Sequence, residues 1–342
     1  MSVEPYGIVR TGDVVYTKSP LSTNPYGIIK TNKGKTGIVS TLYAIYHATE
    51  KANPYFIQCY FEEKARMNNY IRPLVNKGAK NDMKVTSDNA LKGYVIFPKV
   101  DEQTKIFDLF EHLDNLITLH QRKYDKLVNV KKALLDKMFP KNGLKIPEIR
   151  FKGFFDAWEQ RKLGELGSIQ TGNTPSTTVK DYYDDNGLLW VTPTDITQNI
   201  IHNTERKLSK KGQQVGRVIS KNSILCTCIA SIGKNAFLPV KCAFNQQINS
   251  LTPNENLHNP YFLFTDSYHW SNTMKKGAGG LTFQIVNKTE FSNIITNIPK
   301  KIAEENSIGN LFYKLDNLIT LHQRECDKLK NIKKSLLERM FV

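Results

Sequence analysis

The sequence has no run of apolar residues that approaches the roughly 18 to 20 needed to cross a bilayer. Its first ten residues, MSVEPYGIVR, have neither the basic segment nor the apolar segment of a signal peptide. These two absences predict a cytosolic protein. The five cysteines are few and odd in number, and no second pair or nearby histidine completes a zinc-binding spacing around Cys226 and Cys228. We therefore expect buried thiols on a strand rather than disulfides or a metal site.

The sequence also lacks the motifs of known catalytic sites. NKGKTG at 32–37 contains Gly-Lys-Thr, but Ile29 stands where a phosphate-binding P-loop needs a glycine. There is no G-x-S-x-G, H-E-x-x-H or C-x-x-C motif, and the seven histidines are scattered. The acid pair 184–185 falls in a turn-like stretch, and the pair 304–305 falls where a helix begins, as expected for partners of the helix dipole. The sequence predicts a polypeptide that is not itself a catalyst and binds no metal or cofactor of its own.

Three Asn-Pro-Tyr stretches begin at Asn24, Asn53 and Asn259. Each is similar to the tetrad with which adenine methyltransferases hold a flipped base, but the second proline is missing every time. Proline is common at the first position of a helix, because its missing N–H would have no partner there. We interpret the three stretches as starts of helices or turns.

Positive charge is what the sequence has in excess. Lys and Arg number 48 against 32 Asp and Glu, which gives a net charge of +16. Such an excess favours a polyanionic partner, most often nucleic acid, although an anionic membrane surface would attract it too. At 342 residues the chain is longer than a single core usually supports, so two domains are expected.

A long segment occurs twice. LDNLITLHQR at 113–122 returns at 315–324, and 22 of the 31 residues from 109 to 139 are identical to those 202 positions later. Both copies have the apolar spacing of a long amphipathic helix, about 50 Å in length for roughly 35 residues. Every seventh residue forms a series that predicts a coiled-coil seam between the copies, with the two histidines as polar residues that fix its register. The series consists of Leu113, His120, Leu127 and Leu134, and of Leu315, His322, Leu329 and Leu336.

The segments before the two helices are more distantly related. GDVVYTKSP at 12–20 corresponds to NSILCTCIA at 222–230, and NPYF occurs in both halves. Short β-rich runs alternate with turn clusters, which predicts a mixed α+β fold. The organisation is a globule at 1–100, a helix at 101–140, a linker at 141–157, a globule at 158–300 and a helix at 301–342. Because 158–210 has no counterpart in the first half, the first globule is expected to be partial.

Most of the positive charge falls outside the helices, which carry about +2 together. Lys and Arg neutralise DNA phosphates, whereas Asn, Gln, Ser and Thr on loops can contact base edges. Loops are also polar simply because they face water, so each candidate has that alternative. The candidates in the first globule are Lys30, Lys33, Lys35, Lys77, Lys80 and Lys84. Those in the second globule are Thr171, Asn173, Thr174, Ser176, Thr194, Gln246, Gln247, Lys275, Lys276, Gly279, Thr282 and Gln284.

Several motifs together resemble the specificity subunit of type I restriction-modification systems, the HsdS family. They are W-x₄-L-G-E-L with TGNTPS at 158–176, P-x₃-E-Q-x₂-I at 98–106, the doubled LDNLITLHQR, and the helix endings LLDKMFP and LLERMFV. The resemblance implies two target-recognition domains that each contact one part of a bipartite double-stranded DNA site. It implies that two antiparallel helices, related by a pseudo-two-fold axis, separate these domains.

The resemblance also implies the partners. Two methyltransferase subunits would dock around the helices and methylate adenine, and restriction subunits would add ATP-dependent translocation and cleavage. S-adenosylmethionine, ATP and Mg²⁺ would then belong to the partner subunits. Two other functions remain open: a stand-alone DNA methyltransferase or nuclease, and a coiled-coil adaptor with no role on DNA.

Overall fold

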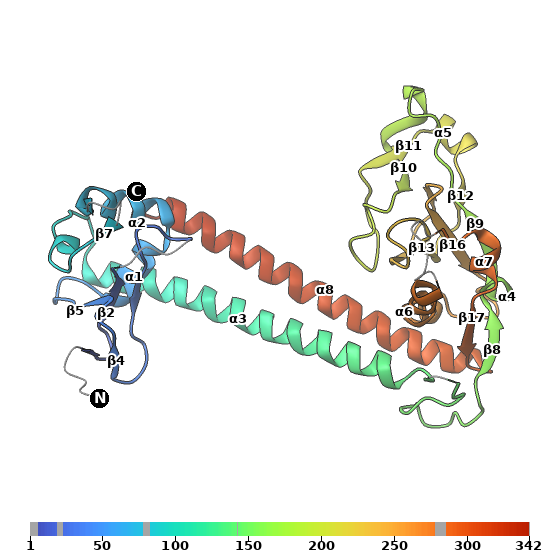
Figure 1. Cartoon of the computed structure of the whole chain (residues 1–342), viewed down its shortest axis with the longest axis horizontal. Coiled ribbons are helices and arrows are strands. Elements are labelled where there is room, and N and C mark those ends of the chain that lie inside the picture. The colour runs from blue at the N-terminus through green and yellow to red at the C-terminus, as the bar shows by residue number, and fades with distance from the viewer. Residues whose placement is uncertain (1–5, 19–22, 78–82, 142, 278–284, 342) are drawn as a thin grey trace. The chain divides into compact units, whose positions relative to one another are not determined.

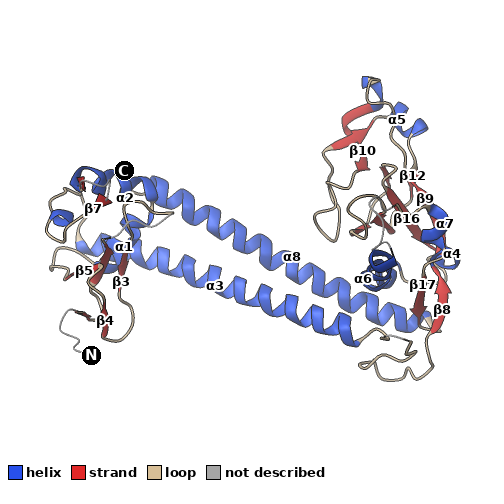
Figure 2. Cartoon of the chain, viewed as in Figure 1, coloured by secondary structure: helices blue, strands red, loops and turns tan. Residues whose placement is uncertain are grey.

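The computed structural model describes residues 6–18, 23–77, 83–141, 143–277 and 285–341. They form two compact units (Figures 1 and 2). The first unit comprises Met1–Lys123 and His322–Val342, and the second comprises Tyr124–Leu321. The division falls within the two long helices, α3 (Val100–Lys137) and α8 (Ile302–Arg339), so each unit contains one globule and a part of both helices. The architecture is α+β.

The first unit has a small antiparallel sheet in the order β3-β2-β5. Its strands are β2 (Val14–Thr17), β3 (Ile29–Thr31) and β5 (Tyr43–Tyr46). The other elements of this globule are β1 (Gly7–Val9), β4 (Gly37–Val39), α1 (Pro54–Glu62), α2 (Lys64–Ile71), η1 (Arg72–Leu74), β6 (Asn76–Lys77), β7 (Met83–Lys84) and η2 (Asn89–Leu91). Aromatic and aliphatic side chains from the sheet and both α-helices form its core, including Tyr16, Phe61 and Ile71.

The second unit has two four-stranded sheets, in the orders β14-β13-β16-β9 and β11-β10-β15-β12. A separate two-stranded sheet pairs β17 (Ile295–Ile298) with β8 (Glu159–Lys162). The first sheet comprises β9 (Gly167–Thr171), β13 (Ser223–Thr227), β14 (Asn235–Leu238) and β16 (Ile248–Pro253), and the second comprises β10 (Tyr183–Val191), β11 (Arg206–Leu208), β12 (Val218–Ile219) and β15 (Cys242–Phe244). The helical elements are α4 (Leu163–Leu166), η3 (Lys180–Tyr182), α5 (Lys210–Val215), α6 (Pro260–Gly277) and α7 (Lys288–Ser292).

The central strands β2 and β13 occupy corresponding places in the two units. Each lies between two antiparallel neighbours, in β3-β2-β5 and in β14-β13-β16. Each also follows a residue with positive φ, Gly12 at 87° and Asn222 at 61°, and glycine and asparagine adopt that conformation most readily. Beyond β16 the second unit adds β9, whereas the sheet described for the first unit ends at β5. The distant relation between the globules is thus visible in their strand order.

Each globule contacts its long helix in the same way. The backbone N–H of Asn53 donates to Gln103 Oε1 at 2.7 Å, and that of Asn259 donates to Glu305 Oε2 at 2.8 Å. The side chain of each asparagine accepts from backbone N–H groups in the first turn of α1 or α6. The stretches at Asn53 and Asn259 are therefore helix starts, and Asn24 begins a turn that closes on the N–H of Gly27, as predicted.

The two long helices pack against each other in both units. In the first unit the rings of Phe110 and Phe341 stack 5.9 Å apart, and the Nδ1 atoms of His120 and His322 lie 3.1 Å apart. Residue numbers rise along one helix as they fall along the other, so the pairing is antiparallel. Leu113 is buried in this unit, where Leu329 and Leu336 pack against it and its neighbours. In the second unit Leu315 is buried, and Leu127 and Leu134 pack against the same core.

No helix in the described part of the chain combines the length and the apolar character that a membrane crossing requires.

Candidate DNA interface

Two of the predicted loops of the second unit come together. The loop after β9 contains Asn173, whose N–H donates at 3.0 Å to the carbonyl oxygen of Phe244, the last residue of β15 before the β15–β16 loop. Thr174 Oγ1 donates to Gln246 Oε1 at 2.5 Å across the same contact. A Cβ atom at Gly172 would lie 2.2 Å from the carbonyl oxygen of Asn245, so only glycine permits this approach. The predicted polar side chains of both loops therefore form one surface.

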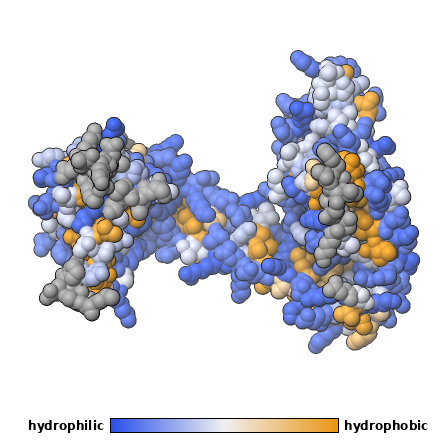
Figure 3. Space-filling view, in the orientation of Figure 1, coloured by the Kyte–Doolittle hydropathy of each residue, from blue (hydrophilic) through white to orange (hydrophobic). Residues whose placement is uncertain are grey.

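Within this surface, the side chains differ in their exposure and in their hydrogen bonds to the rest of the unit. Thr174, Ser176 and Gln246 are exposed. Asn173 is held by its own scaffold, because its Nδ2 donates to Val215 O at 2.7 Å and its Oδ1 accepts from the N–H of Arg217. Two further candidates are half-buried in contacts of the scaffold: Thr171 donates to Asn249, and Gln247 accepts from Asn245. Figure 3 shows that hydrophilic residues cover much of the visible face of each unit.

Thr194 lies on a third loop, after β10. Its hydroxyl is 2.8 Å from that of Thr192, and Asp195 accepts from both the N–H and the hydroxyl of Thr192. Thr194 itself is exposed. The chain continues from this loop into 196–199, which forms one side of a cavity.

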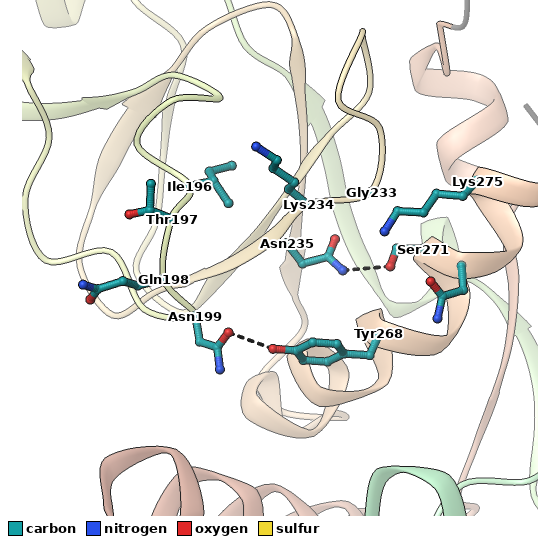
Figure 4. Close-up of a pocket in the computed structure, with 11 residues that line it drawn as sticks. Ile196, Thr197, Gln198, Asn199, Gly233, Lys234, Asn235, Tyr268, Ser271 and Lys275 are labelled. Carbon is teal, nitrogen blue, oxygen red and sulfur yellow. Dashed lines mark hydrogen bonds between the residues drawn. The ribbon is translucent and has the colours of Figure 1, made fainter. Parts of the chain in front are cut away.

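That cavity has a volume of about 250 Å³ and lies among the 196–199 loop, the turn between β13 and β14, and α6 (Figure 4). Its lining is largely polar and includes two exposed lysines, Lys234 and Lys275. Lys275 was predicted from the sequence but Lys234 was not, because its only signal is a Gly-Lys-Asn turn between two apolar strands. The residues that line it are Ile196, Thr197, Gln198, Asn199, Gly233, Lys234, Asn235, Tyr268, Ser271, Asn272 and Lys275.

The cavity adjoins a buried ion pair between the long helices. Lys131 Nζ of α3 lies 2.6 Å from Asp316 Oδ1 of α8, and both side chains are almost completely buried. Asp316 also accepts from Tyr261 Oη at 2.8 Å and from Asn199 Nδ2 at 3.2 Å. Burial, together with the Asp316 carboxylate, holds the pKa of Tyr261 far above its ordinary value, so this phenol remains a donor.

The lysine candidates of the first unit differ in their surroundings. Lys30 and Lys35 are exposed. Lys33 is engaged within the unit, because its Nζ lies 3.0 Å from Glu111 Oε1 and 4.7 Å from the ring centre of Phe107. Four of the candidates lie outside the described residues, namely Lys80, Gly279, Thr282 and Gln284, and so do the side chains of Lys77, Lys84 and Lys276.

The cysteines have the surroundings of core residues. All five are free thiols and buried. Burial raises the pKa of Cys59 to about 11 and that of Cys242 to about 12, which keeps both thiols protonated and unreactive. Among the described residues, no group of three or more His, Cys, Asp or Glu side chains is placed to hold a metal ion.

Comparison with known proteins assigns the chain to a family. Residues 156–331, just over half of the chain, match the model described as "Type I restriction modification DNA specificity domain". The type I restriction enzyme MjaIX specificity subunit of Methanocaldococcus jannaschii is 25% identical over 191 residues, which are 54% of this chain and 44% of that protein. The HindI specificity subunit of Haemophilus influenzae is 33% identical over 149 residues, which are 42% of this chain and 32% of that protein. The chain thus matches less than half the length of these two relatives.

A solved structure supports the same fold. The crystal structure of a type I restriction-modification system S subunit from M. genitalium superimposes with a TM-score of 0.68, although the sequences are only 12% identical. The superposition covers 98% of this chain and 84% of that one. By its match to the family model, this chain belongs to the family of type I restriction-modification DNA specificity proteins.

Proposed function

We propose that this chain is the non-catalytic subunit that recognises DNA for a type I restriction-modification complex, with each globule contacting one part of a bipartite site. One observation carries the proposal: the chain repeats a globule joined to a helix, with equivalent contacts at Asn53 and Asn259. Two DNA-binding globules, each joined to a copy of the same helix, suit two half-sites on one duplex. Family membership supplies the chemical class of the target.

The charge and the loops of the globules support DNA as the ligand. The chain carries +16, and its two long helices account for little of that excess. Exposed lysines would neutralise phosphates, and exposed Thr174, Ser176 and Gln246 would present hydroxyl and amide groups to base edges. We include Lys30, Lys35, Thr194 and the other residues predicted from the sequence among those that would contact DNA.

Exposed apolar side chains recur at equivalent positions of the long helices, which supports docking of two like partners. In the first unit, Leu119 is 47% exposed and Ile332 is 39% exposed. The second unit has their equivalents 202 positions away, Leu321 at 51% and Val130 at 39%. Exposed apolar side chains at equivalent positions of the two units suit two copies of one partner. We assign these two surfaces to two methyltransferase subunits, which would bind S-adenosylmethionine.

Restriction subunits would complete the complex and bind ATP and Mg²⁺, and the assembly would act in the cytoplasm. The chain itself would perform no chemistry. This part of the proposal rests on the resemblance of the whole pattern to HsdS.

The test is to express the chain with the methyltransferase subunit of its own system and to map methylated adenines in the host DNA. We expect one bipartite motif, and sequence-selective binding by the purified complex that weakens steeply as salt rises. The double variant Leu119→Asp/Leu321→Asp should lose the methyltransferase subunits and the methylation. Leu144→Asp, which changes an exposed leucine of the linker, should keep both.

Two results would contradict the proposal. Methylation or cleavage by the purified chain alone, given S-adenosylmethionine and Mg²⁺, would make it an enzyme. Stable capture of two large partners without any retention on DNA would make it an adaptor.

A further inference from the structure

The cavity of the second unit contains positive charge that no neighbouring acid balances. None of its eleven lining residues is acidic. Among the described residues, neither Lys234 nor Lys275 makes an ion pair, although many lysines elsewhere in the chain do. Both lysines line the same cavity, so an anion bound in it would be stabilised by both ammonium groups.

The backbone beside Lys275 is shaped to let its side chain pass. Gly233 has φ of +78°, a conformation that favours glycine. A Cβ atom at this position would lie 2.6 Å from Cε and 3.2 Å from Cγ of Lys275. The turn therefore favours glycine, and a side chain at this position would displace the end of Lys275. Figure 4 shows Lys275 reaching from α6 toward Asn235 and Ser271.

The walls of the cavity are fixed before any ligand arrives. Asn235 Nδ2 donates to Ser267 O at 3.0 Å and to Ser271 Oγ at 2.9 Å, which ties the β13–β14 turn to α6. Asn235 Oδ1 is buried without a hydrogen-bond partner, so it remains available to accept from an ammonium group. On the other side, Tyr268 Oη donates to Asn199 Oδ1 at 2.8 Å (Figure 4). Asn199 Nδ2 in turn donates to Asp316 of α8 at 3.2 Å.

We propose that this cavity holds one phosphate of the DNA backbone between Lys234 and Lys275. The inference deepens the proposed function and rests on it. The lining has amide, hydroxyl and ammonium groups but only Tyr268 as an aromatic surface, which suits a phosphate better than a stacked base. A phosphate contact at this point would help to position the duplex on the second unit. It carries no sequence information of its own.

The experiment measures salt dependence. The complex of the chain with its methyltransferase subunits is titrated with two fluorescent duplexes, one that carries its methylation motif and one that does not, at several salt concentrations. The variant is Lys234→Ala/Lys275→Ala, and the matched control is Lys221→Ala/Lys241→Ala, which removes the same charge from exposed lysines of the same unit outside the cavity.

We expect the cavity variant to bind both duplexes more weakly by the same factor. The slope of log K against log salt should become shallower by about 0.9, the contribution of one phosphate, whereas the control keeps the wild-type slope. Gly233→Ala, which keeps every charge but displaces Lys275, should lose part of the same affinity. Circular dichroism checks that each variant is folded.

The outcomes separate this inference from the proposed function. If the wild-type complex binds neither duplex, the proposed function fails and the cavity inference fails with it. If the wild type discriminates between the duplexes and the cavity variant keeps its full slope, the phosphate site is refuted while the function stands. If the variant keeps the slope but loses the discrimination, the cavity contacts bases, and the inference is also refuted.

Discussion

The ion pair between Lys131 and Asp316 gives the sharpest prediction for stability. At 2.6 Å, and with an effective dielectric constant of about 20, the attraction of the two charges is about 6 kcal/mol before desolvation. Lys131→Met removes one charge and leaves the buried carboxylate of Asp316 with only neutral donors, Tyr261 and Asn199. We expect a loss of about 3 to 5 kcal/mol in the free energy of unfolding of the second unit.

The first unit contains a matched control. Lys333 stands 202 positions after Lys131, and its Nζ lies 2.7 Å from Asp114 and 2.9 Å from Glu62. Both of those acids are much more exposed than Asp316, so water can solvate them when the lysine is removed. Lys333→Met should therefore cost only about 1 kcal/mol in the first unit.

The assay follows each unit separately during unfolding in urea. All three tryptophans lie in the second unit, so their fluorescence reports that unit, and hydrogen exchange of peptides from α1 reports the first. The double variant Lys131→Met/Asp316→Asn removes the isolated charge and should recover part of the stability lost in Lys131→Met. A loss below about 1 kcal/mol for Lys131→Met, or equal losses for the two lysine variants, would refute the claim that burial sets the difference.

Three further predictions concern titration and reactivity. Burial raises the pKa of Asp266 to about 7 from an ordinary 3.8, so the folded state keeps this proton to a higher pH than the unfolded state does. The free energy of unfolding should therefore fall as pH rises from about 4 to about 7. In Asp266→Asn, the urea midpoint should depend less on pH over this range. Burial, and then the charges of His120 and Lys123, lower the pKa of His322. The unfolded state therefore binds a proton more readily than the folded state, and stability falls as pH drops below about 6.5. In His322→Gln, melting temperatures measured across this range should depend less on pH. The five buried thiols should resist iodoacetamide in the folded chain and react only after denaturation, and mass spectrometry that finds rapid labelling of the native protein would contradict the burial.

The sequence predicted the long helices well because their signal is repeated and periodic. The identity of 113–122 with 315–324 placed both copies, and the seven-residue series placed Leu113 and Leu315 among the buried residues. The Asn-Pro starts at Asn53 and Asn259 were predictable for a different reason, because capping depends on residues next to each other in the chain. Features that depend on neighbouring residues or on a periodic pattern can be predicted from a single sequence.

Contacts between distant residues were not predictable in the same way. Glu304 was expected only as a partner of the helix dipole, yet it is buried, accepts from Arg150 at 2.6 and 2.8 Å and lies 3.3 Å from Trp158 Nε1. Nothing in the spacing of these residues brings them together, because the fold of the second unit does so. The cavity has the same origin, since Lys234 and Lys275 come from a turn and a helix that lie 40 positions apart in the sequence.

The repeat also shows where the two halves are free to differ. Lys131 and Lys333 are equivalent, and so are their partners Asp316 and Asp114 on the opposite helix. The residue that each globule adds differs: the ring of Tyr268 lies 5.1 Å from Lys131 Nζ, whereas the corresponding side chain in the first unit, Glu62, forms an ion pair with Lys333. The two helices must fit each other, so a change on one requires a matching change on the other. A globule only has to place a favourable side chain beside the ammonium group of the lysine, and an aromatic face or a carboxylate can serve. Unlike globules can therefore rest on nearly identical helices, and this is the arrangement that the proposed recognition of two different DNA half-sites requires.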